Sequence, residues 1–209
     1  MPRDKTATHI KLLQCIRKEF LEKGYEETSL NHIAKMAGIT SAGVYRHFTS
    51  KEDMFISLVE PTLNEFKELW KKIMDDICAD ISDKNSKKNY SRYRKYFSIR
   101  LLEFIYKNDD HMQGAKLLVT CSHGTKYENF ENYLVEMDVN ATKELISKFE
   151  DIGVHCNEIS DDELRAVATV FVFSFCEIIK HQFPKKLAYE YVDFIDRLLN
   201  PGCKDILGF

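Results

Sequence analysis

The segment from Thr28 to Phe55, TSLNHIAKMAGITSAGVYRHFTSKEDMF, restricts what this chain can fold into more than any other part of its sequence. Its first third predicts a short amphipathic helix, because apolar residues recur there at three- and four-residue spacing: Leu30, Ile33, Ala34 and Ala37. Either Thr28 or Ser29 can cap that helix by accepting hydrogen bonds from its unpaired amides. Gly38 follows the last apolar position, where a left-handed backbone conformation ends a helix without steric cost.

A second short helix is predicted from Ser41 to Phe48, with Thr40 as its cap. It would bury Val44 and Phe48 and leave small and polar side chains on its open face. Small residues at a helix start let the backbone and short polar groups approach base edges and phosphates. Two short helices joined at a glycine, with the second one open at its start, are typical of a DNA-reading helix-turn-helix.

The flanking segments complete a three-helix unit. Upstream, Thr8 to Lys23 has helical periodicity, and Gly24 is expected to end that helix. Downstream, Ser50 to Asp53 has the pattern of a capping box with Asp in place of Glu or Gln, so a long helix is expected to begin there.

Charge separates this N-terminal head from the rest of the chain. Residues 1–51 contain nine Lys or Arg and five Asp or Glu, a net charge of +4, whereas the whole chain has a formal net charge of −3. Residues 52–209 therefore carry −7. A basic head on an acidic body suits a protein of which only one end meets phosphate.

Within this segment the IAxxAGI, VYRHF and SKEDMF elements resemble the DNA-binding signature of the TetR/AcrR family of bacterial repressors, over roughly residues 8–56. The resemblance implies phosphate contacts from Tyr45, His47 and Lys51. Arg46 could reach a guanine or lie along the backbone, and the sequence leaves both open. The competing interpretations of the segment are a helix-turn-helix used for protein contacts and an αα-hairpin whose resemblance is accidental.

The predicted DNA-binding residues include two that could also act simply as helix caps, Thr28 and Ser29. Others correspond to family positions that touch bases or approach them closely. The complete set is Thr28, Ser29, Asn31, Thr40, Ser41, Ala42, Gly43, Tyr45, Arg46, His47 and Lys51.

The rest of the chain is long enough for one further apolar core and has mainly helical periodicity. We therefore expect an all-α fold with a helix-turn-helix domain at residues 1–50. A helical ligand-binding and dimerisation domain is expected at residues 51–209, its functions being implied by the resemblance. The expected elements of this body are a long helix from residue 51, a loop at 82–89, helices at 90–106, 113–121 and 127–152, one begun by a capping box at 160–163, and one at 188–200 ended by Pro201 and Gly202.

The stretch from Ala166 to Cys176, AVATVFVFSFC, is apolar on nearly all sides, so it must be covered on both. It is shorter than the roughly 20 residues that a bilayer requires, and Met1 to His9 does not resemble the start of a signal peptide. We expect a cytoplasmic protein without membrane contact. The family forms homodimers through its last two helices, which implies a four-helix interface here. The predicted interface residues are Val167, Phe171, Phe175, Ile178, Tyr191, Ile195 and Leu198.

Aromatic residues on several body helices could enclose an apolar ligand or could simply fill the core. Because the family usually senses small molecules there, the resemblance implies an unidentified small-molecule ligand. The candidate pocket residues are Phe66, Trp70, Phe97, Leu101, Phe104, Tyr127, Phe130 and Phe171. The favoured interpretation is a repressor that such a ligand releases from a palindromic double-stranded DNA operator. The alternative is a helix-turn-helix protein that acts without a small ligand, through protein partners or constitutive occupancy of DNA.

The cysteines and histidines give only weak evidence of a disulfide or metal site. The six cysteines form no CxxC pair, which in a cytosolic chain indicates free thiols. Cys121 and His123 with His111 could in principle bind a metal, as could Glu177 with His181. Neither set has enough ligands at a suitable spacing, so we expect no metal site.

The Ser122–Gly124 stretch, Ser-His-Gly, superficially resembles a nucleophile site. It lacks a preceding strand, an oxyanion turn and a placed acidic residue. We therefore expect no catalytic residues, no enzymatic activity and no cofactor.

Overall fold

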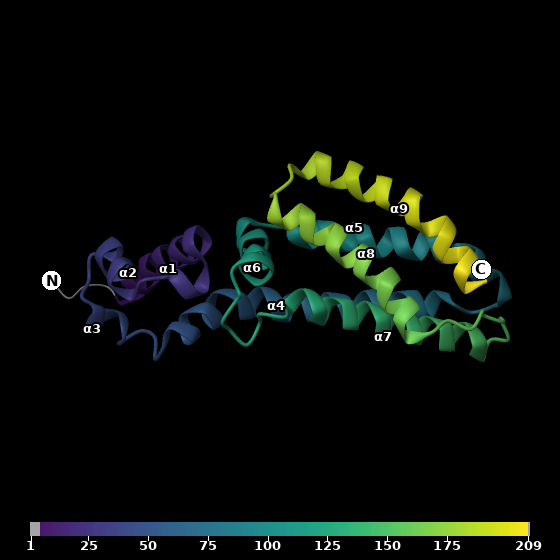
Figure 1. Cartoon of the computed structure of the whole chain (residues 1–209), viewed down its shortest axis with the longest axis horizontal. Helices are drawn as coiled ribbons and strands as arrows, with labels where there is room; N and C mark the ends of the chain where they lie inside the picture. The colour runs from purple at the N-terminus through teal and green to yellow at the C-terminus, as the bar shows by residue number, and fades with distance from the viewer. Residues whose placement is uncertain (1–4, 209) are drawn as a thin grey trace. The chain divides into compact units, whose positions relative to one another are not determined.

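The computed structural model describes residues 5–208, and over that range it consists of helices and contains no strand (Figure 1). This confirms the all-α fold class. No helix within the described range has the length and apolar character needed to span a bilayer. The elements in order are α1 (Lys5–Glu27), α2 (Leu30–Ala37), α3 (Ser41–Val44), α4 (Lys51–Asp80), the 3-10 helix η1 (Lys84–Asn89), α5 (Tyr90–Ile105), α6 (Asp109–Thr120), α7 (Phe130–Asp151), α8 (Asp161–Lys180) and α9 (Lys185–Leu207).

Contacts divide the chain into two compact units. Unit 1 comprises the residues up to Glu65 together with Gln113–Phe130, and unit 2 comprises Phe66–Met112 and the residues from Glu131 onward. The helices α4 and α6 therefore each contribute to both units. The expected functional division at residues 50 and 51 stays a prediction.

The core of unit 1 forms where α1 packs on the start of α4. Leu12, Ile16 and Phe20 of α1 are fully buried, and the Phe20 ring meets Phe55 of α4 edge-on, with ring centroids 5.4 Å apart. Gly24 interrupts α1 at φ 77° and ψ 171°, a conformation that favours glycine. The expected break at Gly24 is confirmed, although the chain returns to helical geometry up to Glu27.

The start of α4 differs slightly from the expected capping box. The Ser50 hydroxyl accepts a hydrogen bond from the Asp53 amide at 2.9 Å, as predicted. The Asp53 carboxylate accepts from the amide of Thr49, at 2.8 Å, rather than from that of Ser50. An Asp side chain is one methylene shorter than Glu, and here it pairs with an amide one residue further back. Pro61 lies inside α4 without ending it.

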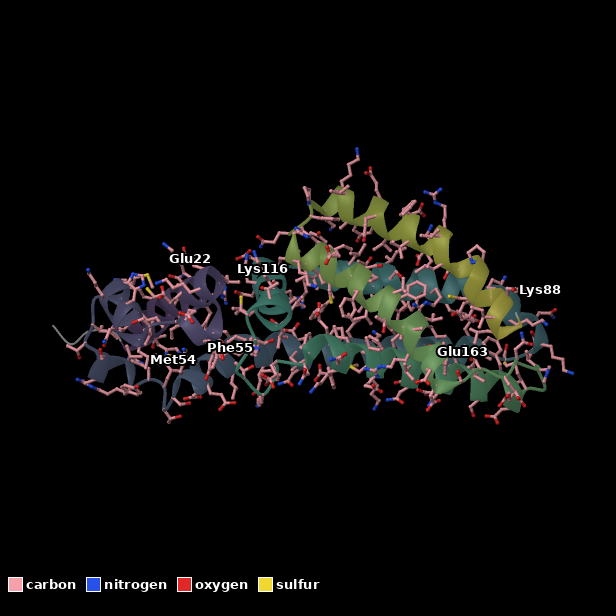
Figure 2. All side chains as sticks on the ribbon, in the orientation of Figure 1. Glu22, Met54, Phe55, Lys88, Lys116 and Glu163 are labelled. Atoms are coloured by element: carbon pink, nitrogen blue, oxygen red, sulfur yellow. The ribbon has the colours of Figure 1, made fainter. Side chains whose placement is uncertain are left out.

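Unit 2 is built on α5, α7, α8 and α9 and the later part of α4, with side chains filling the spaces between the ribbons (Figure 2). One apolar cluster of unit 2 joins Ile73 and Ile77 of α4, Phe97 of α5, and Leu145 and Phe149 of α7. The capping box at the start of α8 is confirmed, because the Ser160 hydroxyl accepts from the Glu163 amide and the Glu163 carboxylate accepts from the Ser160 amide.

Two expectations about unit 2 were wrong. The predicted loop at residues 82–89 contains η1, which Asp83 caps through the Asn85 amide at 2.7 Å. The last helix does not stop before Pro201 but continues to Leu207 and ends at Gly208, with φ 80°. Cys203 and Leu207 are buried against Tyr90 and Phe171, so burial of this last turn outweighs the hydrogen bond that proline removes.

A helix-turn-helix with a groove beside its second helix

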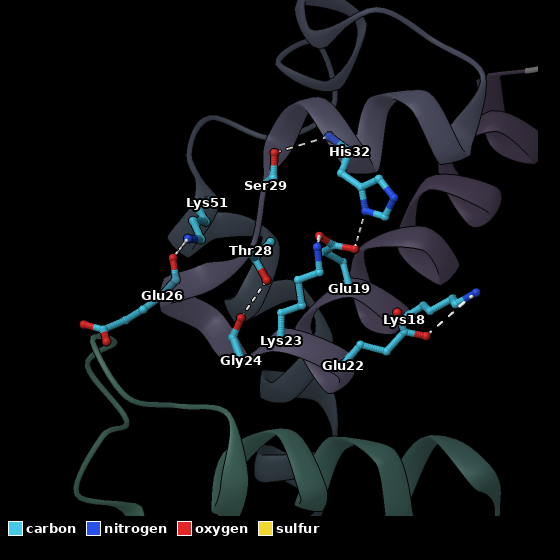
Figure 3. Close-up of polar contacts among 10 residues, drawn as sticks. All are labelled: Lys18, Glu19, Glu22, Lys23, Gly24, Glu26, Thr28, Ser29, His32 and Lys51. Carbon is cyan, nitrogen blue, oxygen red and sulfur yellow. Dashed lines mark hydrogen bonds and ion pairs between the residues drawn. The ribbon is translucent and has the colours of Figure 1, made fainter.

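Ser29, and not Thr28, is the cap of α2. The Ser29 hydroxyl accepts a hydrogen bond from the His32 amide at 3.4 Å (Figure 3). Thr28 is only 7% exposed, and its hydroxyl donates to the Gly24 carbonyl at 2.6 Å, across the break in α1. Thr28 therefore has a structural role in the head.

The turn of the motif has the expected geometry. Gly38 adopts φ 72° and ψ 33°, and the next amide, that of Ile39, donates to the Ala34 carbonyl at 3.0 Å. The Thr40 hydroxyl accepts from the Gly43 amide at 3.1 Å and caps α3. Gly38 thus ends the first helix and Thr40 begins the second, as predicted.

The second helix is shorter than predicted. Regular α-helix covers Ser41–Val44, and the chain continues through a tightened turn in which the His47 amide donates to the Val44 carbonyl at 2.9 Å. The amide of Arg46 likewise donates only three residues back, to Gly43, at 3.3 Å. Val44 and Phe48 are nevertheless buried as expected.

Most of the predicted DNA-binding residues lie together at the surface of the head. Tyr45 is 53% exposed. The Ser41 hydroxyl donates to the Asn31 side-chain oxygen at 2.7 Å, which joins the two helices of the motif. The remaining predicted residues are exposed at positions 29, 40, 42 and 46 and half-buried at positions 43, 47 and 51.

Lys51 has a structural contact besides its predicted role. Its ammonium group donates to the Glu26 carbonyl at 2.8 Å (Figure 3). The same group lies 4.8 Å from the centre of the Tyr25 ring. Burial lowers the pKa of Lys51, and the nearby carboxylates of Glu27 and Glu26 oppose that shift. Lys51 therefore fastens the end of α1 to the start of α4.

A buried carboxylate beneath α2 was missed by the sequence analysis. Glu19 of α1 is fully buried, and its carboxylate lies 2.6 Å from His32 Nδ1 and 3.3 Å from Lys23 Nζ. Burial alone would raise the pKa of Glu19, but hydrogen bonds from His32 and Lys23 outweigh it and hold the pKa below its usual value. This group fastens α2, the first helix of the motif, to α1. Only the spacing of Glu19 and Lys23, four residues apart, could have indicated part of it.

A broad groove of about 1230 Å³ lies beside α3. It lies between the start of α1 and the helix-turn-helix, and four of the predicted DNA-binding residues line it. Its lining residues are Thr6, Thr8, His9, Gly38, Ile39, Thr40, Gly43, Arg46 and His47. The α1 residues of this groove were also missed, because nothing in their spacing distinguishes them from a solvated helix face.

Residues 12–58 match the model of the bacterial regulatory proteins, tetR family. The matched segment contains the helix-turn-helix, so the head of the chain is of the tetR type. It is 35% identical over 80 residues to an HTH-type transcriptional regulator of Staphylococcus aureus, a match that covers 38% of this chain and 43% of that regulator. It is 30% identical over 133 residues to IcaR of Staphylococcus epidermidis, the negative transcriptional regulator of the biofilm operon icaADBC, covering 63% of each chain.

The match to these curated relatives thus spans between two fifths and two thirds of their lengths. A solved structure of AibR in complex with isovaleryl coenzyme A and operator DNA has the same fold, with a TM-score of 0.59 and 15% identity over 92% of this chain and 97% of that one.

Four of the candidate pocket residues form one row of touching rings in unit 2. Ring centroids are 5.7 Å apart for Phe66 and Trp70, 6.1 Å for Phe66 and Phe104, and 4.7 Å for Trp70 and Phe97. Leu101 packs in the same cluster as Phe97.

The other candidate pocket residues lie elsewhere. Phe171 belongs to a second cluster, where the Arg94 guanidinium stacks 3.8 Å from its ring centre. Tyr127 and Phe130 are part of unit 1, and the Tyr127 hydroxyl donates to the Glu60 carboxylate at 3.0 Å. The structure therefore brings together five of the eight candidates.

The predicted interface residues on α8 and α9 divide into buried and exposed ones. Phe171 and Ile178 are buried within the protomer itself, so neither presents a surface to a second chain in this structure. Leu198 is 61% exposed, and the other four predicted residues are half-buried. Large exposed apolar side chains that the prediction omitted lie on the same two helices: Val170, Phe173, Leu187, Phe194 and Ile206. Periodicity could not separate the exposed from the buried residues of α8, because residues 166–176 are apolar on nearly all sides of the helix.

The remaining candidates from the sequence are the six cysteines and the two possible metal sites. All six cysteines are free thiols. Within residues 5–208, no three metal-binding side chains gather at one point. Nε2 of His181 lies 3.2 Å from Oε2 of Glu177, and the two side chains form a surface pair at the end of α8.

Proposed function

We propose that the protein is a transcriptional repressor that binds a palindromic double-stranded DNA operator as a homodimer and leaves it when a small molecule binds the helical body. The observation that carries the DNA-binding part is the start of α3. There, the small residues from Thr40 to Gly43 form the N-terminus of the helix, and Thr40 and Gly43 line the groove. Such an end can approach base edges closely while its amides attract phosphate.

The charge distribution supports the same surface. The head carries a net charge of +4 in a chain whose overall net charge is −3. Phosphate contacts release counterions from DNA, so binding should weaken steeply as salt increases. The exposed Tyr45 and Arg46 would contact the backbone or the groove edge on either side of α3.

The apolar side chains exposed on α8 and α9 support a homodimer. Val170 and Phe173 lie one turn apart on α8, and Phe194 and Leu198 lie one turn apart on α9. A symmetric four-helix contact would remove these side chains from water, which favours association. Two copies of α3 could then enter two half-sites about 34 to 36 Å apart or somewhat more.

The aromatic row in unit 2 supports a ligand of apolar character, and the structure of AibR provides an example of this fold holding both a coenzyme A ester and operator DNA. A hundredfold loss of DNA affinity requires only about 2.7 kcal/mol of differential ligand binding between two conformations. One observation favours the alternative, constitutive DNA binding: Phe66, Trp70 and Phe97 already touch one another, as residues of a filled core do.

Selection from a random duplex library tests the DNA-binding proposal directly. We expect the protein to enrich a palindromic sequence and to prefer it to random competitor at moderate salt. Tyr45→Ala should weaken binding to the enriched duplex by about tenfold, the value of roughly one hydrogen bond. Tyr133→Ala, which removes an exposed tyrosine from α7, is the matched control and should bind normally. Failure to enrich any sequence would refute the proposal.

A thermal-shift screen with cationic amphiphiles and acyl coenzyme A esters separates the two regulatory alternatives. A ligand that raises the melting temperature and releases the enriched duplex supports ligand-controlled repression. If no compound of either class does both, constitutive occupancy becomes the better account.

A further inference from the structure

Two histidine rings lie against each other in the lining of the groove beside α3. His9 belongs to α1 and His47 follows α3, and their ring centroids are 5.4 Å apart. His9 also stacks on Phe48, with centroids 5.3 Å apart and an interplanar angle of 22°. Because Phe48 is buried, its ring gives His9 a fixed support at the wall of the groove.

The charges around this pair favour an anion. Among the described residues that line the groove, Arg46 is a cation and none is Asp or Glu. Lys11 extends toward the same turn, since its ammonium group lies 3.8 Å from the point that a Cβ on Gly38 would occupy. The hydroxyls of Thr6, Thr8 and Thr40 add polar groups to the lining.

We propose that His9 and His47 together bind one backbone phosphate of the DNA, and that the complex takes up a proton as it forms. The inference rests on the DNA-binding function proposed above and adds a residue outside the matched segment 12–58. In the complex, a ring N–H of each imidazole donates to a phosphate oxygen, and at least one imidazole is in its cationic form.

Proton uptake follows from the charge of the phosphate. A phosphate that both imidazoles contact favours their cationic forms because it has the opposite charge. Histidine changes charge between about pH 5 and pH 8. Since the DNA complex holds more protons than the free protein, DNA affinity should rise as the pH falls through this range.

The test uses the 209-residue chain and the duplex that it enriches from a random library. Binding is measured by fluorescence anisotropy at pH 6 and pH 8 at constant ionic strength. One linked proton corresponds to as much as tenfold in affinity per pH unit, so the wild-type protein should bind about tenfold or more tightly at pH 6 than at pH 8. His9→Phe keeps a ring on Phe48 and removes the titrating group. It should reduce this ratio to below about threefold.

Controls separate a phosphate contact from a packing role. His9→Gln keeps a hydrogen-bond donor without the charge, and it should lose the pH dependence as His9→Phe does. His155→Ala removes an exposed histidine outside the head and should keep the wild-type ratio. Thermal melting of each variant reports whether the head still folds.

The outcomes are distinct. If the wild-type protein binds no duplex selectively, the proposed function itself fails. If it binds and His9→Phe retains the full pH dependence, the histidine pair is not the phosphate site and the inference is overturned. A double-variant cycle of His9 and His47 should give coupling of several-fold in affinity at pH 6, and independent effects of the two would also overturn it.

Discussion

Replacing Gly114 with alanine is a sharp test of how closely α6 packs against α4 within unit 1. A Cβ at Gly114 would lie 2.5 Å from Thr62 Oγ1 and 2.9 Å from Thr62 Cβ. Carbon atoms in contact are normally about 3.5 to 4.0 Å apart. The Thr62 hydroxyl can rotate away, but its Cβ is fixed to the α4 backbone, so the two helices must separate by roughly 0.5 to 1 Å.

The expected cost is the difference of two effects. Overpacking of this kind costs about 1 to 3 kcal/mol. Alanine in place of glycine within a helix contributes up to about 1 kcal/mol of stabilisation. We therefore expect Gly114→Ala to destabilise the protein by about 1 kcal/mol, and at most by about 2 kcal/mol.

Gly202→Ala provides the matched control. Gly202 also lies inside a helix, α9, and a Cβ there would meet no atom within 4 Å. This change should stabilise the protein by about 0.5 to 1 kcal/mol through helix propensity alone. In a protein of this size 1 kcal/mol moves the melting temperature by roughly 2 to 4 °C. Thermal unfolding followed by circular dichroism should place Gly114→Ala about 4 to 8 °C below Gly202→Ala, and equal melting temperatures would refute the close α4–α6 packing.

Three further predictions concern the head and the exposed apolar face. Because the folded-state pKa of Glu19 is lowered, the stabilising contribution of its carboxylate is present above the unfolded pKa and is lost as the pH falls through the folded pKa. The melting temperature of Glu19→Gln should therefore depend less on pH in the acidic range than that of the wild type or of the exposed control Glu22→Gln. Lys51→Met keeps the stem but loses the donor to the end of α1, and urea unfolding should show a loss of about 1 kcal/mol. Leu198→Asp should yield monomers in light scattering, whereas the equally apolar and exposed Ile10→Asp on α1 should not; dimers in both would place the interface elsewhere.

The elements that the sequence predicted best are those whose ends depend on local chemistry. Gly38 ends α2 because only the left-handed backbone region continues the chain there, and Ser160 with Glu163 begins α8 through reciprocal hydrogen bonds. Both depend on residues within four positions of each other. Such features can be read from a sequence because no distant part of the chain has to be known.

Features that depend on contacts between distant segments could not be predicted in this way. Glu19 and His32 are 13 residues apart and meet only after α1 and α2 pack. Pro201 should end a helix by local rules, and it fails to do so because Cys203 and Leu207 are buried by residues of other helices. The same limit applied to α8, where the apolar pattern did not say that Phe171 and Ile178 face inward while Val170 and Phe173 face solvent.

The break in α1 at Gly24 helps to explain how the end of that helix is held in the head. Where the chain leaves helical geometry, the Tyr25 amide donates to the carbonyl of Cys121, directly after α6, at 3.1 Å. Gly124 in the following loop lies so close to Glu26 that a Cβ would approach its side chain to 3.0 Å. The end of α1 is thus clamped by α6 and its loop on one side and by Lys51 of α4 on the other. Since α4 and α6 are the two helices that continue into unit 2, a displacement of either one would have to break these contacts or carry α1 with it.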